Sequence, residues 1–121
     1  MGPDSYKGQF YVNEQRQLVR HGMGTMQYST GAIYEGQWKH GQRQGFGRLV
    51  HATGDMYEGM WSNDRGNGHG TFTNTDGYKY VGIWRDDCQD GRGTETWQSN
   101  KSKYEGTFVM GKKSGQGRYQ W

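Results

Sequence analysis

The side chains best suited to catalysis or metal binding are few in this sequence and do not converge. The histidines fall at unrelated positions of the chain: His21, His40, His51 and His69. The one acidic cluster, Asp86, Asp87 and Asp90, lacks the spacing and the terminal glutamate of a calcium loop. The Gly-x-Gly pairs never extend into the longer glycine motifs that hold nucleotide phosphates. The sequence therefore predicts no catalytic residues, no metal site and no cofactor, so we expect no enzyme.

The dominant feature of the chain is an internal repeat that opens with Tyr-x-Gly-x-Trp or Tyr-x-Gly-x-Phe and continues to a Gly-x-Gly block. Its copies begin at five tyrosines: Tyr6, Tyr34, Tyr57, Tyr80 and Tyr104. The central copies follow each other at intervals of 23 residues, while the first copy has a loop lengthened by five residues. We therefore predict one repeat domain over residues 6–121, preceded by a tail or a cloning scar at residues 1–5.

The composition favours a small protein with an aromatic core. Leu, Ile, Val and Phe together number only 13 of 121 residues, whereas aromatic residues reach 15%. The 22 glycines recur periodically and there is one proline, which argues against a flexible linker. A net charge of +3 is weak for a nucleic-acid partner, so we predict none. Without an apolar run long enough for a signal peptide or a membrane span, and with Cys88 as a lone thiol, we expect a soluble, cytoplasmic protein.

The spacing within each repeat predicts β-strands. The first tyrosine, the glycine and the second aromatic residue are two positions apart, so an extended strand directs all three to one face. The Gly-x-Gly block alternates in the same way, which makes each repeat a hairpin whose strands are joined by residues 39–44 in the second copy. Gly54 lies in a turn to the next hairpin, where positive φ is expected. The sequence thus predicts an all-β fold, an elongated, twisted single-layer antiparallel β-meander of five stacked hairpins, in which aromatic rings fill the space over strand glycines.

These residues resemble the MORN (membrane occupation and recognition nexus) repeat, whose pattern is approximately Tyr-Glu-Gly-x-Trp followed by regularly spaced glycines. The copy from Tyr34 to Gly54 matches this pattern almost completely. Departures occur at the loop glycine, the turn glycine and one apolar column: Asp64, Asp87, Asn100 and Glu95. The resemblance implies an interaction scaffold. Similar arrays bind helical or extended segments of partner proteins in cilia and the cytoskeleton, target membranes, or accompany kinase and methyltransferase domains.

The aromatic face of the predicted sheet is the first candidate binding site, because contiguous exposed aromatic surface commonly marks an interaction site. The predicted protein-binding groove comprises Phe10, Tyr34, Trp38, Leu49, Tyr57, Trp61, Phe72, Tyr80, Trp84, Tyr104 and Phe108. The alternative is that these rings only cover glycines and form the core. If the groove is accessible, the protein is a non-catalytic scaffold for a helical or extended partner segment.

Anionic membrane lipid is a second candidate ligand. Basic residues recur near the hairpin loops and would line one edge of the sheet: Lys39, Arg43, Arg65, Arg85, Lys112 and Lys113. A solubilising rim is the alternative explanation, because aspartates interrupt this row. Two further hypotheses remain open, namely a regulatory fragment of a larger enzyme and a homo-oligomer formed through unpaired sheet edges.

Overall fold

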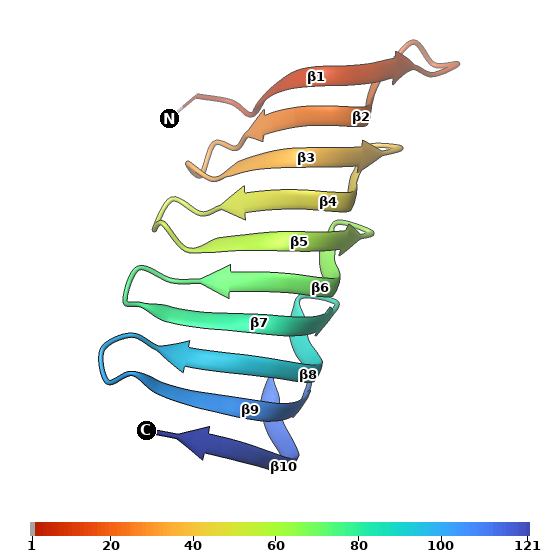
Figure 1. Ribbon diagram of the computed structural model, residues 1–121. Helices are drawn as coiled ribbons and strands as arrows, with labels where there is room; N and C mark the ends of the chain where they lie inside the picture. The colour runs from red at the N-terminus through yellow and green to blue at the C-terminus, as the bar shows by residue number, and fades with distance from the viewer. Residues whose placement is uncertain (1) are drawn as a thin grey trace.

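The chain folds as one open sheet in the computed structural model, which describes residues 2–121. Its strands are antiparallel and lie in chain order, and these residues contain no helix. The ten strands are β1 (Ser5–Val12), β2 (Leu18–Gln27), β3 (Ile33–Lys39), β4 (Gln42–Val50), β5 (Met56–Ser62), β6 (Arg65–Thr73), β7 (Tyr78–Arg85), β8 (Cys88–Trp97), β9 (Ser102–Val109) and β10 (Lys112–Gln120). Figure 1 shows them stacked like rungs from β1 to β10. The predicted all-β meander of five stacked hairpins is confirmed.

A row of glycines crosses the whole sheet, one from each strand and each directly opposite the next. Its members are Gly8, Gly24, Gly36, Gly47, Gly59, Gly70, Gly82, Gly93, Gly106 and Gly117. The tyrosine that opens each repeat lies over this row. The Tyr34 hydroxyl is 2.1 Å from the place where a Cβ would stand on Gly47 and 2.8 Å from that on Gly36. The prediction that aromatic rings fill the space over strand glycines is therefore confirmed.

The tryptophans connect one repeat to the one before it. Trp61 packs edge-to-face on Tyr57 of its own repeat and on Tyr34 of the preceding repeat, with ring centroids 5.1 Å and 5.3 Å away. Its Nε1 donates a hydrogen bond to the carbonyl of Gly47 at 3.0 Å, and the other two central tryptophans make the equivalent bond. Because edge-to-face contact is the favoured arrangement of aromatic pairs, the alternating rings form a continuous core on one face of the sheet.

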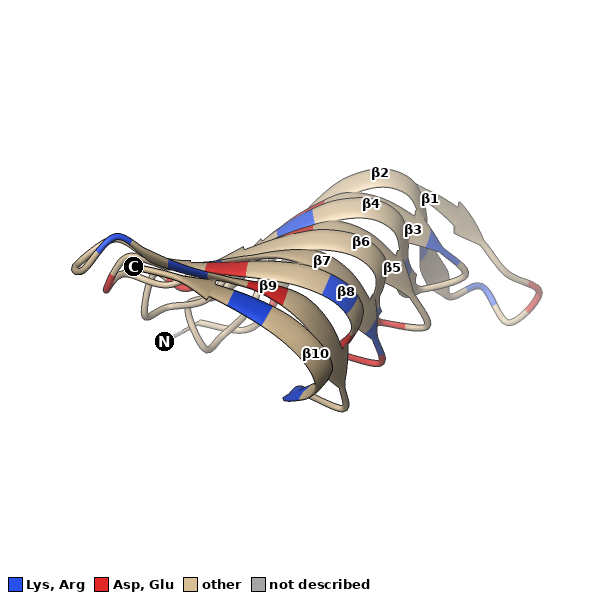
Figure 2. Ribbon diagram, turned by 60° about the horizontal axis from the view of Figure 1, so that its bottom comes forward, with Lys and Arg blue, Asp and Glu red and all other residues tan. Residues whose placement is uncertain are grey.

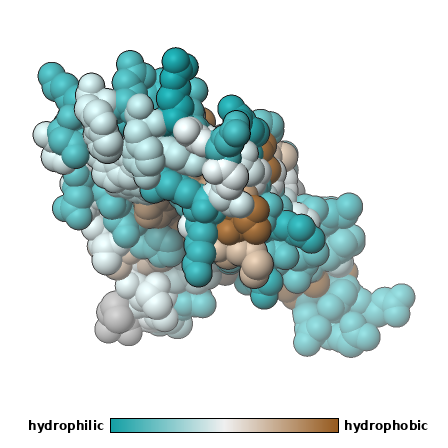
Figure 3. All heavy atoms as spheres, turned by 90° about the horizontal axis from the view of Figure 1, so that it is seen from below, coloured by the Kyte–Doolittle hydropathy of each residue, from teal (hydrophilic) through white to brown (hydrophobic). Residues whose placement is uncertain are grey.

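The surface outside this core is largely hydrophilic. Seen from the β10 end, hydrophilic and neutral residues cover most of the molecule and hydrophobic atoms gather in a small region between them (Figure 3). The view in Figure 2 shows that the strands are bent as well as twisted, with charged residues distributed along the strands and turns. A single layer of this kind has only one apolar face to bury, so its core is narrow.

The hairpin turns are shorter than the sequence predicted. The connection expected over residues 39–44 contains only two turn residues, His40 and Gly41, whose φ values of 49° and 84° are those of a two-residue hairpin turn. The other residues belong to the strands, and a bulge at Gly45, with φ of 87°, absorbs the two residues that β4 has in excess of β3 between the pairs Gly36–Gly47 and Trp38–Arg43. In the turn between repeats, Gly54 has the positive φ that was predicted, 96°.

The two aspartates that replace the loop glycine within a hairpin fit the same two-residue turn geometry. Asp64 and Asp87 adopt φ values of 67° and 69°, a conformation that aspartate tolerates better than most residues. Each carboxylate also accepts a hydrogen bond from the preceding repeat: Asp64 Oδ1 from the Arg43 N–H at 2.8 Å, and Asp87 Oδ1 from the Gly66 N–H at 2.7 Å. These departures from the repeat pattern therefore add a link between neighbouring hairpins.

Replacing a glycine of the central row should destabilise the sheet. In Gly47→Ala the new Cβ would lie 2.1 Å from the Tyr34 hydroxyl, and this ring is fully buried and has no free space to move into. We expect the free energy of unfolding to fall by about 3 kcal/mol in urea denaturation. Gly66→Ala is the matched control, because its Cβ would approach Tyr57 no closer than 3.1 Å and should cost less. Equal losses in the two variants would contradict a specific role for the glycine row.

Candidate functional site

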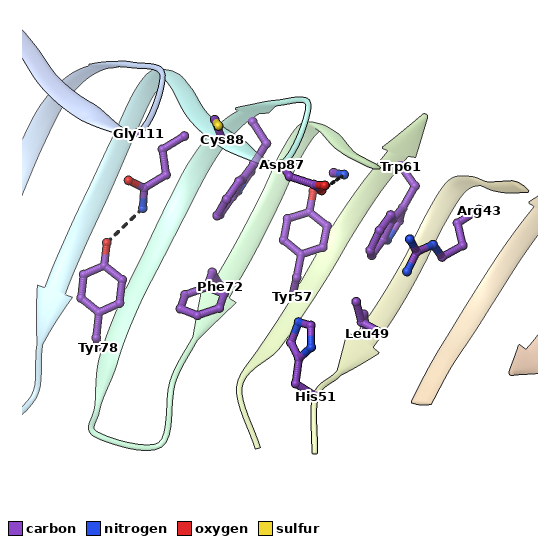
Figure 4. A pocket seen from close by; sticks show the side chains of 13 residues that line it. Arg43, Leu49, His51, Tyr57, Trp61, Phe72, Tyr78, Asp87, Cys88 and Gly111 are labelled. Carbon is purple, nitrogen blue, oxygen red and sulfur yellow. Dashed lines mark hydrogen bonds between the residues drawn. The ribbon is translucent and has the colours of Figure 1, made fainter. Parts of the chain in front are cut away.

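A hollow of about 600 Å³ lies on the aromatic face of the sheet, between β4 and β8 (Figure 4). Its walls are mostly apolar side chains: Leu49, Tyr57, Trp61, Phe72, Tyr78 and Trp84. Polar side chains and turn residues border it: Arg43, His51, Asp87, Cys88, Gln89 and Gly111. Because residues of two hairpin turns share the lining with residues of the strands, the sheet curves toward its aromatic face here. The hollow is thus a concave, mainly apolar surface with a few polar groups, which is typical of a binding site.

The residues predicted to line the groove divide into two sets. Seven are buried in the core: Tyr34, Trp38, Tyr57, Trp61, Tyr80, Tyr104 and Phe108. Only Leu49, Phe72 and Trp84 combine partial exposure with a place in the hollow, while Phe10 is exposed on β1 and lies outside it. The accessible surface is therefore confined to the third repeat and its neighbours, because elsewhere the rings cover one another.

The basic residues predicted to face lipid flank the hairpin turns along one edge of the sheet. Four of them are exposed there: Lys39, Arg65, Arg85 and Lys112. Lys113 is also exposed, but its Nζ lies over the Tyr104 ring and 3.0 Å from Glu95 Oε1. Arg43 differs, because it lies in β4 with its guanidinium over the aromatic face, 4.7 Å from the centroid of Trp61. Its Nε is 3.3 Å from Asp64 Oδ1. Arg43 is thus engaged inside the protein and does not project from the edge.

A column of residues that the sequence analysis did not recognise as one set runs along the core rings. These residues, which we call the covering column, stand opposite the second aromatic residue of each repeat: Arg20, Arg43, Gly66, Gln89 and Lys113. The guanidinium carbon of Arg20 is 4.9 Å from the Trp38 centroid, and Lys113 Nζ is 5.1 Å from the Tyr104 centroid. Such cation–π contacts contribute about 0.5–1 kcal/mol at exposed sites. Their spacing of 23 residues, with 24 at the last step, was the signal in the sequence that could have revealed the column.

A buried polar cluster closes one side of the hollow. Glu95 occupies a column that is apolar in the other repeats, and only 6% of its surface is exposed. The Tyr78 hydroxyl donates a hydrogen bond to Glu95 and accepts one from Gln89 Nε2 at 3.0 Å, while Lys113 Nζ lies 3.0 Å from Glu95 Oε1. Burial, together with the hydrogen bond to Glu95, raises the pKa of Tyr78 above its usual value. The carboxylate is therefore compensated by a hydrogen bond and an ion pair.

The histidines do not assemble a catalytic group. The rings of His21 and His40 do meet, with centroids 4.9 Å apart, because the His40 N–H donates to His21 Nδ1 at 3.1 Å. His51 borders the hollow, and His69 lies beside a separate depression near the glycine row. Within residues 2–121, no three His, Cys, Asp or Glu side chains lie close enough to hold a metal ion. The same residues include no helix with the length and apolar character of a membrane span.

An open, single-layer β-sheet built from repeated hairpins, with one concave aromatic face, defines a repeat protein of the interaction type. The MORN repeat model matches residues 19–33, 34–56, 57–77, 80–102 and 104–121, so the chain belongs to the MORN repeat family. A comparison with curated proteins finds no match. MORN repeats form interaction modules for proteins or membranes and are generally non-catalytic.

The first hairpin lies mostly outside these matches but has the local structure of the other repeats. The Tyr6 hydroxyl donates a hydrogen bond to the carbonyl of Gln9 at 2.6 Å, three residues further along the chain. Tyr34 makes the equivalent bond to Gln37 at 2.9 Å. The same tyrosine contact therefore organises β1, although its sequence departs from the family pattern.

The tyrosine core should make the fold sensitive to alkaline pH. Burial raises the pKa of Tyr80 to about 12 and also raises the pKa values of Tyr34 and Tyr57. Because an unfolded chain releases these protons near pH 10, the free energy of unfolding should fall as the pH rises from about 10 to about 12. The tyrosinate absorbance of the buried tyrosines should therefore increase in one cooperative step, together with loss of the circular dichroism of the sheet. A gradual titration of all nine tyrosines with the sheet intact would contradict this expectation.

Proposed function

We propose that the chain is a non-catalytic scaffold that binds a segment of a partner protein in the hollow of its aromatic face. The observation that carries this proposal is the concave, mostly apolar hollow itself, where Leu49, Phe72 and Trp84 keep part of their surface exposed. Exposed apolar surface of this kind is costly in water and favours an interaction site. The hydrogen-bonded sheet beneath it provides rigid support.

The dimensions of the hollow restrict the partner segment. The hollow reaches from β4 to β8. Four strand spacings correspond to about 19 Å. That length accommodates roughly six residues of extended chain or about 13 residues of helix. The partner therefore contributes a short linear segment along the direction in which the hairpins stack.

A charge placed in the hollow should abolish partner binding. In Leu49→Asp a carboxylate would stand among the apolar walls of the hollow. The variant should therefore recover the wild-type partner proteins from extracts of the source cells at least about tenfold less well. Phe46→Asp is the matched control, because Phe46 is exposed on the opposite face of the same strand. Quantitative mass spectrometry of the captured proteins makes the comparison, after circular dichroism has shown both variants folded. Equal recovery with both variants would contradict the proposal.

We infer a second candidate function, peripheral binding to anionic lipid through the hairpin edge. It is supported by four exposed basic residues that flank the turns along this edge, Lys39, Arg65, Arg85 and Lys112. Each lysine or arginine near an anionic surface contributes about 1 kcal/mol. Two of the interrupting aspartates, Asp64 and Asp87, already accept backbone hydrogen bonds from within the protein. Their carboxylates are therefore partly compensated.

Lipid binding should depend on charge at this edge and on salt. The double variant Arg85→Glu with Lys112→Glu should reduce sedimentation with phosphatidylserine vesicles, and binding should weaken between low and physiological salt, where the Debye length is about 8 Å. Arg48→Glu with Arg118→Glu makes the same charge change away from the turns and should bind more strongly than the edge variant. Equal loss in both double variants would indicate non-specific attraction and remove this candidate.

A further inference from the structure

The hollow owes its depth to one member of the covering column. The other repeats carry a long side chain at this position, and in three of them it is a cation that lies over the rings, but the third repeat has Gly66. The backbone does not require a glycine, because Gly66 is not among the residues with positive φ. The three atoms nearest to a Cβ built on it all belong to Tyr57, at 3.1 Å or more. Gly66 therefore opens the face of the sheet and serves no turn.

The preceding repeat shows what normally occupies this space. The Arg43 guanidinium lies over Tyr34 and Trp61, at 5.8 Å and 4.7 Å from their centroids. Asp64 accepts hydrogen bonds from the Arg43 backbone N–H at 2.8 Å and from its Nε at 3.3 Å. The Arg43 Nη2 also donates to the Asp64 carbonyl at 2.7 Å. One arginine thus contacts two aromatic rings and donates hydrogen bonds to a carboxylate and a carbonyl.

The third repeat reproduces these surroundings around Gly66 without the arginine. Tyr57 and Trp84 correspond to Tyr34 and Trp61, and their centroids are 5.1 Å apart with nearly perpendicular planes. Asp87 corresponds to Asp64, and its Oδ1 accepts the Gly66 N–H at 2.7 Å, which leaves Oδ2 for a second donor. Figure 4 shows Asp87 directed toward Tyr57 at the border of the hollow.

The burial of the rings agrees with this comparison. Tyr34 and Trp61, which Arg43 covers, are 0% and 4% exposed. Tyr57 is 7% exposed, and Trp84 is only partly buried. The rings beside Gly66 are therefore the less covered pair, although their contacts within the sheet are otherwise the same.

We propose that this hollow binds an arginine side chain of the partner segment, with its guanidinium stacked over Trp84 and Tyr57 and paired with the carboxylate of Asp87. This inference rests on the proposed scaffold function and names the side chain that would anchor the partner segment, which we call the arginine anchor. A planar guanidinium can lie on an aromatic ring while its N–H groups reach a carboxylate, whereas a lysine ammonium offers only a compact point charge.

The charges around the hollow favour a bound arginine at the end that Asp87 borders. Asp87 borders the hollow, and within residues 85–90 the three aspartates Asp86, Asp87 and Asp90 outnumber the single cation, Arg85. Arg43 lines the opposite side, and its own pairing with Asp64 compensates its charge. An incoming arginine would therefore enter on the Asp87 side, where complementary charge also accelerates association.

The test is a titration of the isotope-labelled protein with N-acetyl-arginine amide, followed by the NMR signals of the tryptophan indole N–H groups. We expect saturable shifts at Trp84 and Trp61 with a dissociation constant on the order of millimolar, and none at Trp38. N-acetyl-citrulline amide, the uncharged isostere, should produce no saturable shift. A partner segment carrying the arginine would bind more tightly through its additional contacts.

Three variants separate arginine recognition from general attraction. Gly66→Arg should place an arginine over the rings within the chain, as in the preceding repeat, and abolish the shifts. Asp87→Asn keeps an oxygen for the Gly66 N–H but removes the charge, so it should weaken binding at least about tenfold. Asp86→Asn makes the same charge change outside the lining of the hollow and should alter binding less than about twofold.

Several outcomes would overturn the arginine anchor. Equal binding of the citrulline probe, unchanged binding by Asp87→Asn, or equal losses in the Asp86 and Asp87 variants would each do so. If neither probe shifts the indole signals while Leu49→Asp still loses its partners, the scaffold function stands and the anchor is not arginine. Self-association that Gly66→Arg abolishes would identify a second copy of this chain as the guest and overturn the assignment to a partner protein.

Discussion

The fold depends on one contact, a tyrosine ring lying flat against two glycines of neighbouring strands. A single-layer sheet has no second layer to bury its apolar face, so the core must form within the thickness of its own side chains. Glycine alone would weaken a strand, but the ring occupies the space left by the missing Cβ atoms. The contact over Gly36 and Gly47 shows the geometry, and the glycine row extends it to all ten strands. The hydroxyl bond to the carbonyl three residues ahead then fixes the ring.

This constraint divides the aromatic residues between stability and binding. Rings that cover glycines or pack against the next repeat belong to the core and are not accessible to a partner. For this reason Tyr34, Tyr80 and Phe108 are fully buried. Regular repeats therefore leave little surface for a partner. The hollow forms where the repeat departs from its own pattern at Gly66. In this protein the consensus positions build the sheet, and a departure creates the candidate site.

The covering column shows how the sheet protects its core without a second layer. Long cationic side chains bury their stems on the rings and keep their charged ends near water or a carboxylate. Arg43 does so beside Asp64, and Lys113 does so beside Glu95. These pairs connect hairpins that are adjacent in space and about 20 residues apart in sequence. They act as a partial second layer made of individual side chains.

The sequence by itself determined the repeat, the strands and the face of each aromatic residue. Alternation of period two fixes the face of a strand residue, and short connections make neighbouring hairpins pair in chain order. The length of the loop over residues 39–44 could not be derived in this way, because extra residues can enter either a turn or a bulge. The two extra residues of β4 lie in the bulge at Gly45. Which rings stay accessible was decided only by the tertiary structure, since the side chain that covers Trp61 is Arg43 of the preceding repeat.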